Sequence, residues 1–167
     1  MIKLFGASII FIFSTTWGFM SSQIPYKRYK NLLKIISCLN TMKNEIRFSQ
    51  NYIDDVLIKV SKICEFDFIF KTATTFDNTI PISKRWKKAL ICDAQTLKLS
   101  TQDLEVLNSF GAELGMTDRE GQLKNIENTV SILNTLQKSA KDEYEKMSKL
   151  KKGLGLSLGL FTIILLY

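Results

Sequence analysis

The chain has 167 residues, with 23 Lys and Arg against 16 Asp and Glu, and it contains no histidine. Without histidine there is no Ser-His or Cys-His nucleophile pair, and the most common general base is missing. Positive charge often indicates nucleic acid as a partner, but here residues 45–145 carry 13 bases against all 16 acids, so the excess lies near the two ends. We therefore do not expect a nucleic-acid-binding protein.

An uncharged segment opens the chain. Apart from Lys3, residues 1–26 carry no charge, and a helix needs about 20 apolar residues to cross the hydrocarbon core of a membrane. We predict an N-terminal transmembrane helix over residues 1–26, with Pro25 at its exit. The alternative is a secreted protein whose signal peptide is cleaved near residue 22, but no A-x-A-like cleavage site follows the apolar stretch.

A second uncharged segment, residues 153–167, predicts a short C-terminal transmembrane segment. A tail that inserts only part-way is the alternative. Bases without acids flank both segments, five in residues 27–44 and four in residues 146–152. Because Lys and Arg near a span tend to stay in the cytoplasm, we expect the domain between the segments to face the cytoplasm.

Residues 27–152 are predicted to form one helical domain. The chain has two prolines, Pro25 and Pro81, and no long alternation of apolar and polar residues. The predicted fold is an all-α bundle of about five to six helices, flanked by the two transmembrane helices. The apolar residues expected inside it, at spacings of three and four, are Leu32, Leu33, Ile36, Leu39, Met42, Ile46, then Val56, Leu57, Val60, Ile63, then Phe66, Phe68, Ile69, Phe70, then Trp86, Leu90, Ile91, then Leu104, Leu107, Phe110, Ala112, Leu114, and finally Leu123, Ile126, Val130, Leu133, Ala140, Tyr144 and Met147.

Local signals predict where several of these helices begin and end. Ser83 is expected to cap a short helix through Trp86, and Ser100 forms a capping box with Asp103. Gly115 is expected to end that helix in a left-handed conformation. Thr117 with Glu120 predicts a second capping box, which opens a long helix that runs directly into the segment 153–167.

The three cysteines, Cys38, Cys64 and Cys92, are far apart and form no C-x-x-C pair. With no histidine in the chain, this argues against a zinc site. In a domain that faces the cytoplasm we expect reduced, mostly buried thiols. No metal, cofactor or small-molecule substrate is predicted.

The stretch LGMTDREGQ, residues 114–122, is the candidate partner-binding surface. Acids suit the first turn of a helix, whereas Arg119 is disfavoured by the helix dipole. Such an arginine often has a carboxylate partner, within the fold or on another protein. Elsewhere, a basic cluster around Trp86 is read as a solvated helix face with its aromatic turned inward. The predicted binding residues are Asp118, Arg119, Glu120 and Gln122.

These residues also carry a resemblance. The sequence resembles the stage III sporulation protein AB family of endospore-forming bacteria. The matching features are Lys3-Leu4 and Gly6 before the first apolar segment, Glu45-Ile46, Trp86-Lys87-Lys88-Ala89-Leu90, Leu107, Phe110-Gly111, Leu114-Gly115, Asp118-Arg119-Glu120, Gln122, and a basic neck before a short apolar tail. Phe48 stands where the family usually has a tyrosine-like residue, and residues 66–82 are divergent.

The resemblance implies a soluble part like the helical cytoplasmic domain of the type II secretion platform protein F. It implies a non-enzymatic inner-membrane platform in a secretion-like complex that connects mother cell and forespore, on the mother-cell side of the engulfing membranes. The implied partners are the membrane, a cytoplasmic ATPase of the same operon and other membrane subunits. The alternative from the residues is a small membrane-anchored enzyme or lipid-processing factor that uses Asp54 and Asp55.

Overall fold

The computed structural model describes residues 23–48, 52–64, 66–74 and 79–166. These residues form six helices and no strand, which confirms the predicted all-α class. The helices are α2 (Gln23–Phe48), α3 (Ile53–Cys64), α4 (Asp67–Thr74), α5 (Ile82–Leu97), α6 (Thr101–Glu113) and α7 (Arg119–Leu166).

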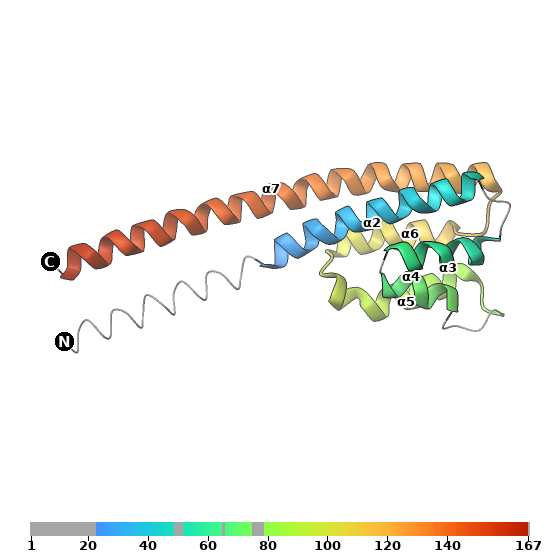
Figure 1. Cartoon of the computed structure of the whole chain (residues 1–167), viewed down its shortest axis with the longest axis horizontal. Coiled ribbons are helices and arrows are strands. Elements are labelled where there is room, and N and C mark those ends of the chain that lie inside the picture. The colour runs from blue at the N-terminus through green and yellow to red at the C-terminus, as the bar shows by residue number, and fades with distance from the viewer. Residues whose placement is uncertain (1–22, 49–51, 65, 75–78, 167) are drawn as a thin grey trace.

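Two long helices form the frame of the molecule. Helix α2 packs along α7, and the four shorter helices gather against one end of this pair, near the start of α7 (Figure 1). The other half of α7 extends away from the bundle, toward the end where α2 begins (Figure 1). The arrangement therefore has a bundled end and an extended end, joined by one continuous helix.

The predicted membrane segments have different outcomes. Residues 1–22 of the first segment lie outside the described residues, and Pro25, the expected exit of that segment, is buried within α2. At the other end, α7 continues as helix across Gly153 to Leu166, as predicted. Among the helices that the structure describes, the end of α7 included, none is long and apolar enough to cross a membrane.

Most of the predicted apolar faces form the core. On α2, the residues from Leu32 to Ile46 that recur every three or four positions are buried. Five predicted positions are wrong, since Leu33 is 39%, Ile63 59%, Phe70 49% and Ile91 61% exposed, and Ala112 is exposed as well. Each directly neighbours a residue that faces the bundle, and one residue along a helix turns the side chain by about 100°.

The start of α5 also differs from the prediction. The helix begins at Ile82 after Pro81, whose side chain makes no cap, and Ser83 lies inside it. Proline holds φ near its helical value, so it starts the helix without a capping hydroxyl. Trp86 is buried as expected, and its ring meets Phe68 and Phe110 edge-on.

Arg28 joins three helices near the point where α7 leaves the bundle. Its Nε and Nη2 donate to the two carboxylate oxygens of Asp103, at 2.7 and 2.9 Å, and its Nη1 lies 3.3 Å from Glu143. Asp103 also accepts from the backbone N–H of Ser100 at 2.8 Å, which completes the predicted capping box of α6. One buried carboxylate therefore fixes the start of α6 to α2, and Arg28 extends the contact to α7.

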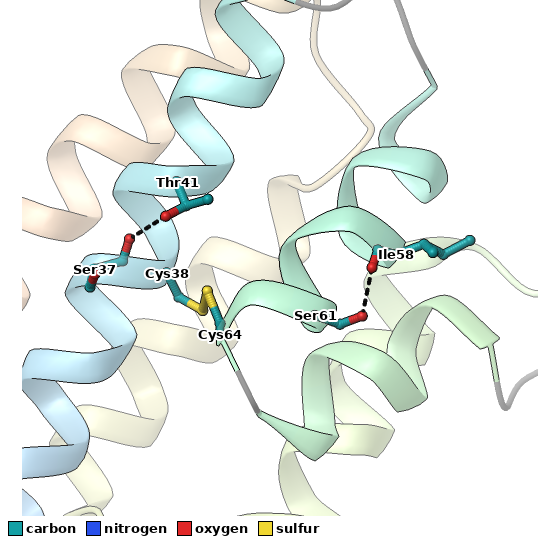
Figure 2. Close-up of a disulfide and its surroundings, with 6 residues drawn as sticks. All are labelled: Ser37, Cys38, Thr41, Ile58, Ser61 and Cys64. Carbon is teal, nitrogen blue, oxygen red and sulfur yellow. Dashed lines mark hydrogen bonds between the residues drawn. A yellow bond between two sulfur atoms is a disulfide. The ribbon is translucent and has the colours of Figure 1, made fainter.

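A disulfide corrects the prediction of reduced thiols. Cys38 of α2 is bonded to Cys64, the last residue of α3, with their Cα atoms 5.6 Å apart (Figure 2). The prediction failed because residues 26 positions apart meet only after α3 folds back along α2. Disulfides persist mainly in oxidising compartments, so this bond predicts that the domain lies outside the cytoplasm. The flanking charges predict the opposite, a domain that faces the cytoplasm.

Thiol counting tests the bond directly. When cells are lysed into denaturant with excess maleimide, we expect one label per chain, on the exposed Cys92. After reduction, we expect three labels, because Cys38 and Cys64 then react. Three labels before reduction would show that the bond does not exist in the cell and would favour a reducing, cytoplasmic location.

Candidate functional site

The candidate site is built on the turn between α6 and α7. Gly115 has φ of +76°, the left-handed conformation predicted for the residue that ends α6. A β-carbon at Gly115 would lie 3.0 Å from Ile82 and 3.6 Å from Ile53. The turn thus packs against the first residues of α5 and α3, and Leu114 beside it is fully buried.

Asp118 caps α7. Its Oδ1 accepts the backbone N–H of Gly121 at 2.9 Å, and its carbonyl accepts the first intrahelical bond, from Gln122. The predicted capping box of Thr117 with Glu120 is therefore wrong by one residue. An aspartate at this position satisfies an exposed amide and also complements the helix dipole, which explains why it replaces threonine.

Gln122 has a structural position. It is 5% exposed, and its Nε2 donates to the carbonyl of Glu113 at 2.9 Å and to the hydroxyl of Thr117 at 2.7 Å. These bonds close the turn between the two helices. Of the four predicted binding residues, Gln122 is thus covered by the fold, whereas Asp118, Arg119 and Glu120 are exposed.

Arg119 and Glu120 project from the first turn of α7. Neither side chain forms a hydrogen bond or ion pair with another residue in the described ranges. The predicted carboxylate partner of Arg119 is therefore not found within the described fold. A partner on another protein stays a prediction, and the exposed guanidinium has the five donors that such a contact would use.

Three exposed apolar residues lie at the same end of the molecule. Phe48 is 83%, Tyr52 84% and Met116 75% exposed, and no other large apolar residue in the described ranges is as exposed. Phe48 ends α2, Tyr52 precedes α3 and Met116 lies in the α6–α7 turn, and these three places meet at the bundled end (Figure 1). We name the group the distal surface; its residues are Phe48, Tyr52, Met116, Asp118, Arg119 and Glu120.

The sequence did not single out these apolar residues as part of a site. Phe48 falls outside the three-and-four spacing of the buried face of α2, and that mismatch was the available signal. Exposed clusters of large apolar side chains commonly mark interaction sites. The combination of apolar and charged groups suits protein binding.

Other candidate groups have roles within the fold. The basic cluster around Trp86 is exposed at Lys84, Lys87 and Lys88, but Arg85 is buried and contacts Asp54 at 2.7 Å. Asp54, a carboxylate of the alternative enzyme hypothesis, is thus one half of an ion pair. Within the described residues, no group of three or more Cys, Asp and Glu could hold a metal ion.

Comparison with known proteins decides the family. The model of the family described as Stage III sporulation protein AB matches residues 3–167. The chain belongs to this family. The stage III sporulation protein AB of Bacillus subtilis (strain 168) is 28% identical over 170 residues, which cover 99% of each chain. A solved structure of a stage III sporulation protein AB matches with a TM-score of 0.63 and 20% identity, over 71% of this chain and 97% of that one.

Membership of the stage III sporulation protein AB family confirms the resemblance drawn from the sequence. The similarity to the solved structure supports the helical fold. Among the residues that carried the resemblance, Trp86, Phe110 and Gly111 belong to the core, whereas Asp118, Arg119 and Glu120 lie on the distal surface.

Proposed function

We propose that the protein is a non-enzymatic, membrane-associated platform in a sporulation-specific secretion-like complex, and that a cytoplasmic ATPase of the complex binds its distal surface. Family membership supports the sporulation role. The observation that carries the mechanical part is α7, one helix of 48 residues that begins at Arg119. At 1.5 Å per residue it is about 72 Å long.

This helix connects two chemically different ends. Its first turn contributes to the distal surface, and its last residues, 153–166, carry no charge. A continuous helix resists bending, so force applied by a partner at the first end would reach the other. A platform that passes movement from an ATPase to a membrane needs such a connection.

Membrane association is supported by the pattern of charge. Four lysines between residues 146 and 152 precede the uncharged end of α7, and five bases follow the uncharged residues 4–26. Basic residues next to apolar segments interact favourably with anionic lipid headgroups. We propose that the two uncharged ends attach the domain to the cell membrane, with the bundled end directed into the mother-cell cytoplasm, as the flanking charges indicate. This orientation requires Cys38 and Cys64 to be reduced in the cell, which the thiol counting tests.

Replacing Arg119 with alanine tests the ATPase contact. We expect binding of the ATPase to weaken about five- to thirtyfold, since truncating an anchoring arginine at an interface costs about 1–2 kcal/mol. The measurement is the dissociation constant between the detergent-solubilised chain and the ATPase, together with spore yield. The fold should remain intact, because Arg119 is exposed and removal of a base from the first turn of a helix is slightly favourable.

Lys138→Ala is the matched control. Lys138 is exposed and lies on the same helix, and its replacement also removes one positive charge, but far from the distal surface. We expect it to bind the ATPase as the wild type does. If the Arg119→Ala and Lys138→Ala proteins bind equally well and sporulate normally, Arg119 does not belong to the contact.

A further inference from the structure

Helix α5 carries a basic face on the outside of the bundle. On its inner side, Trp86 is buried and meets aromatic rings of α4 and α6. The helix lies on the side of the bundle away from α7 (Figure 1). Opposite Trp86, four exposed side chains fall within an arc of about 100°, at 100° per residue. We name them the lysine face: Lys84, Lys87, Lys88 and Ile91.

The lysine face contains no acid that would neutralise it. Asp93, the one acidic residue of α5, contacts Lys71 of α4 at 2.5 Å. Lys84 and Lys87 form no ion pair with any residue in the described ranges. Lys88 already has an interaction partner within the chain. Two positive charges on this face are therefore available to a binding partner.

Ile91 adds a large apolar group to the lysine face. Its side chain is 61% exposed, and it follows Lys87 by about one helical turn. Protein interfaces commonly combine a central apolar contact with a polar rim. A small anion would meet only the lysines, whereas a segment of a protein would contact the lysines and Ile91 together. The composition of the face therefore suits a protein partner that carries acidic residues.

The lysine face adjoins the distal surface. Ile82, the first residue of α5, lies 3.0 Å from the position of a β-carbon at Gly115, in the turn between α6 and α7. Lys84 follows Ile82 by two residues. At the other end of α5, the carbonyl of Leu97 accepts a hydrogen bond from the side-chain amide of Asn31 of α2, at 2.7 Å. The lysine face thus begins beside the distal surface and runs back along the bundle.

We propose that an acidic segment of the ATPase binds the lysine face while the ATPase occupies the distal surface. This inference rests on the proposed function, since it takes the same partner, and it adds the chemistry of the contact. Carboxylates of the partner pair with Lys84 and Lys87, and an apolar side chain of the partner covers Ile91. Opposite charges across an interface raise the rate of association and fix its register.

An acidic protein segment fits this position better than an anionic lipid surface does. The uncharged residues 153–166 lie at the extended end of α7, and α5 lies at the bundled end (Figure 1). A membrane attached at residue 153 is about 50 Å from the start of α7, at 1.5 Å per residue. Lipid headgroups at that distance do not reach a face that begins beside the turn between α6 and α7.

Charge reversal tests the contact in the detergent-solubilised full chain. We expect Lys84→Glu with Lys87→Glu to slow association with the ATPase about tenfold at low salt, because like charges then meet. As the salt concentration rises from about 50 to about 300 mM, association should slow for the wild type but not for this variant. The fold should remain intact, because both lysines are exposed and an acid at position 84, in the first turn of α5, complements the helix dipole.

Variants on α7 serve as matched controls. Lys138→Glu with Lys141→Glu reverses the same number of exposed charges at the same spacing, and it should associate as the wild type does. Ile91→Ser should speed dissociation about fivefold, since most differences in affinity between related complexes lie in dissociation. Ile132→Ser, at a residue that is 50% exposed, should leave dissociation unchanged. Equal association rates for the two double variants would show that no acidic segment meets the lysine face.

Lysine footprinting separates the contact with the ATPase from a contact with lipid. In bilayers that contain phosphatidylglycerol, we expect Lys84 and Lys87 to be protected from acetylation only when the ATPase is bound, whereas Lys138 should react equally in both states. Protection by the bilayer alone would overturn the proposal in favour of lipid. If Arg119→Ala weakens binding and the charge reversal does not, the lysine face fails and the distal contact stands. If the wild type does not bind the ATPase, the proposed docking fails and this contact fails with it.

Discussion

Replacing Asp103 with alanine is expected to lower the free energy of unfolding by about 3–5 kcal/mol, the usual cost of removing one partner of a buried ion pair. The side chain of Asp103 is fully buried and that of Arg28 is 16% exposed. Without the carboxylate, the guanidinium would keep a single partner, the largely solvated Glu143. The backbone N–H of Ser100 would also lose its acceptor, which removes half of the capping box of α6.

Glu143→Ala gives the matched control for this prediction. It removes the other carboxylate that contacts Arg28, but the side chain of Glu143 is 57% exposed and the contact is longer, at 3.3 Å. Exposed ion pairs contribute about 0–1 kcal/mol. Urea unfolding of the two variants should therefore differ by several kcal/mol. Equal and small losses would show that the Arg28–Asp103 contact does not hold the helices together.

Asp103 should also make the free energy of unfolding depend on pH. Burial raises the pKa of Asp103, but hydrogen bonds from Arg28 and Ser100 outweigh it and hold the pKa below its ordinary value. Because the pKa is lower in the folded state, this contribution to stability is fully present above the unfolded pKa of about 3.9 and is lost as the pH falls through the folded value. We expect the wild type to lose stability more steeply below about pH 4 than Asp103→Asn, which has no carboxyl group to titrate.

Sequence periodicity predicted the helices because burial on one face repeats every three or four residues. The faces of α2 and α7, the capping box at Ser100 and the left-handed Gly115 are all local patterns of this kind. The contacts that join helices are not local. Arg28 and Asp103 are 75 residues apart and Cys38 and Cys64 are 26 apart, and nothing in the sequence pairs them.

The charge pattern shows the same limit. From the sequence, Arg28 and Lys43 count simply as two of the bases that flank an apolar segment. In the fold, Arg28 binds Asp103 and Lys43 contacts Glu127 at 2.7 Å. Two of the five bases in residues 27–44 therefore serve the packing of α2 as well.

The candidate site was predicted in part. Composition and helix-start chemistry pointed to residues 118–122, and the structure places three of the four named side chains on the surface. The sequence does not show that the side chain of Gln122 turns inward, because its position depends on a hydrogen bond to the carbonyl of Glu113 across the turn. The exposure of Phe48 and Tyr52 likewise depends on where α2 ends and α3 begins.

Replacing Gly111 with alanine is expected to reduce the free energy of unfolding by about 3 kcal/mol, at the upper end of the usual cost of overpacking. Gly111 lies in α6 beneath the indole of Trp86. A β-carbon there would lie 2.6 Å from Cγ and Nε1 of Trp86, inside the 3.0 Å limit for such contacts, and closer still to Cδ1. The indole cannot easily move, because its Nε1 donates to the carbonyl of Leu107 at 2.9 Å.

The sign of this effect separates packing from helix propensity. In an exposed helix position, glycine to alanine stabilises by about 1 kcal/mol. The reverse change at the exposed neighbour, Ala112→Gly, should accordingly destabilise by about 1 kcal/mol and serves as the control. A Gly111→Ala protein more stable than the wild type would contradict the close contact with Trp86.

A double-mutant cycle identifies the clashing group. Trp86→Phe removes Nε1, one of the three atoms that a β-carbon at position 111 would meet, and it also frees the ring from the hydrogen bond to Leu107, so that the smaller ring can shift. Gly111→Ala should therefore cost less in the Trp86→Phe background than in the wild type, even though Trp86→Phe is itself destabilising through loss of the bond to Leu107. Because Trp86 also contacts Phe68 and Phe110, the absence of a side chain at Gly111 allows one indole to join α4, α5 and α6. Equal costs in the two backgrounds would locate the strain elsewhere in α6.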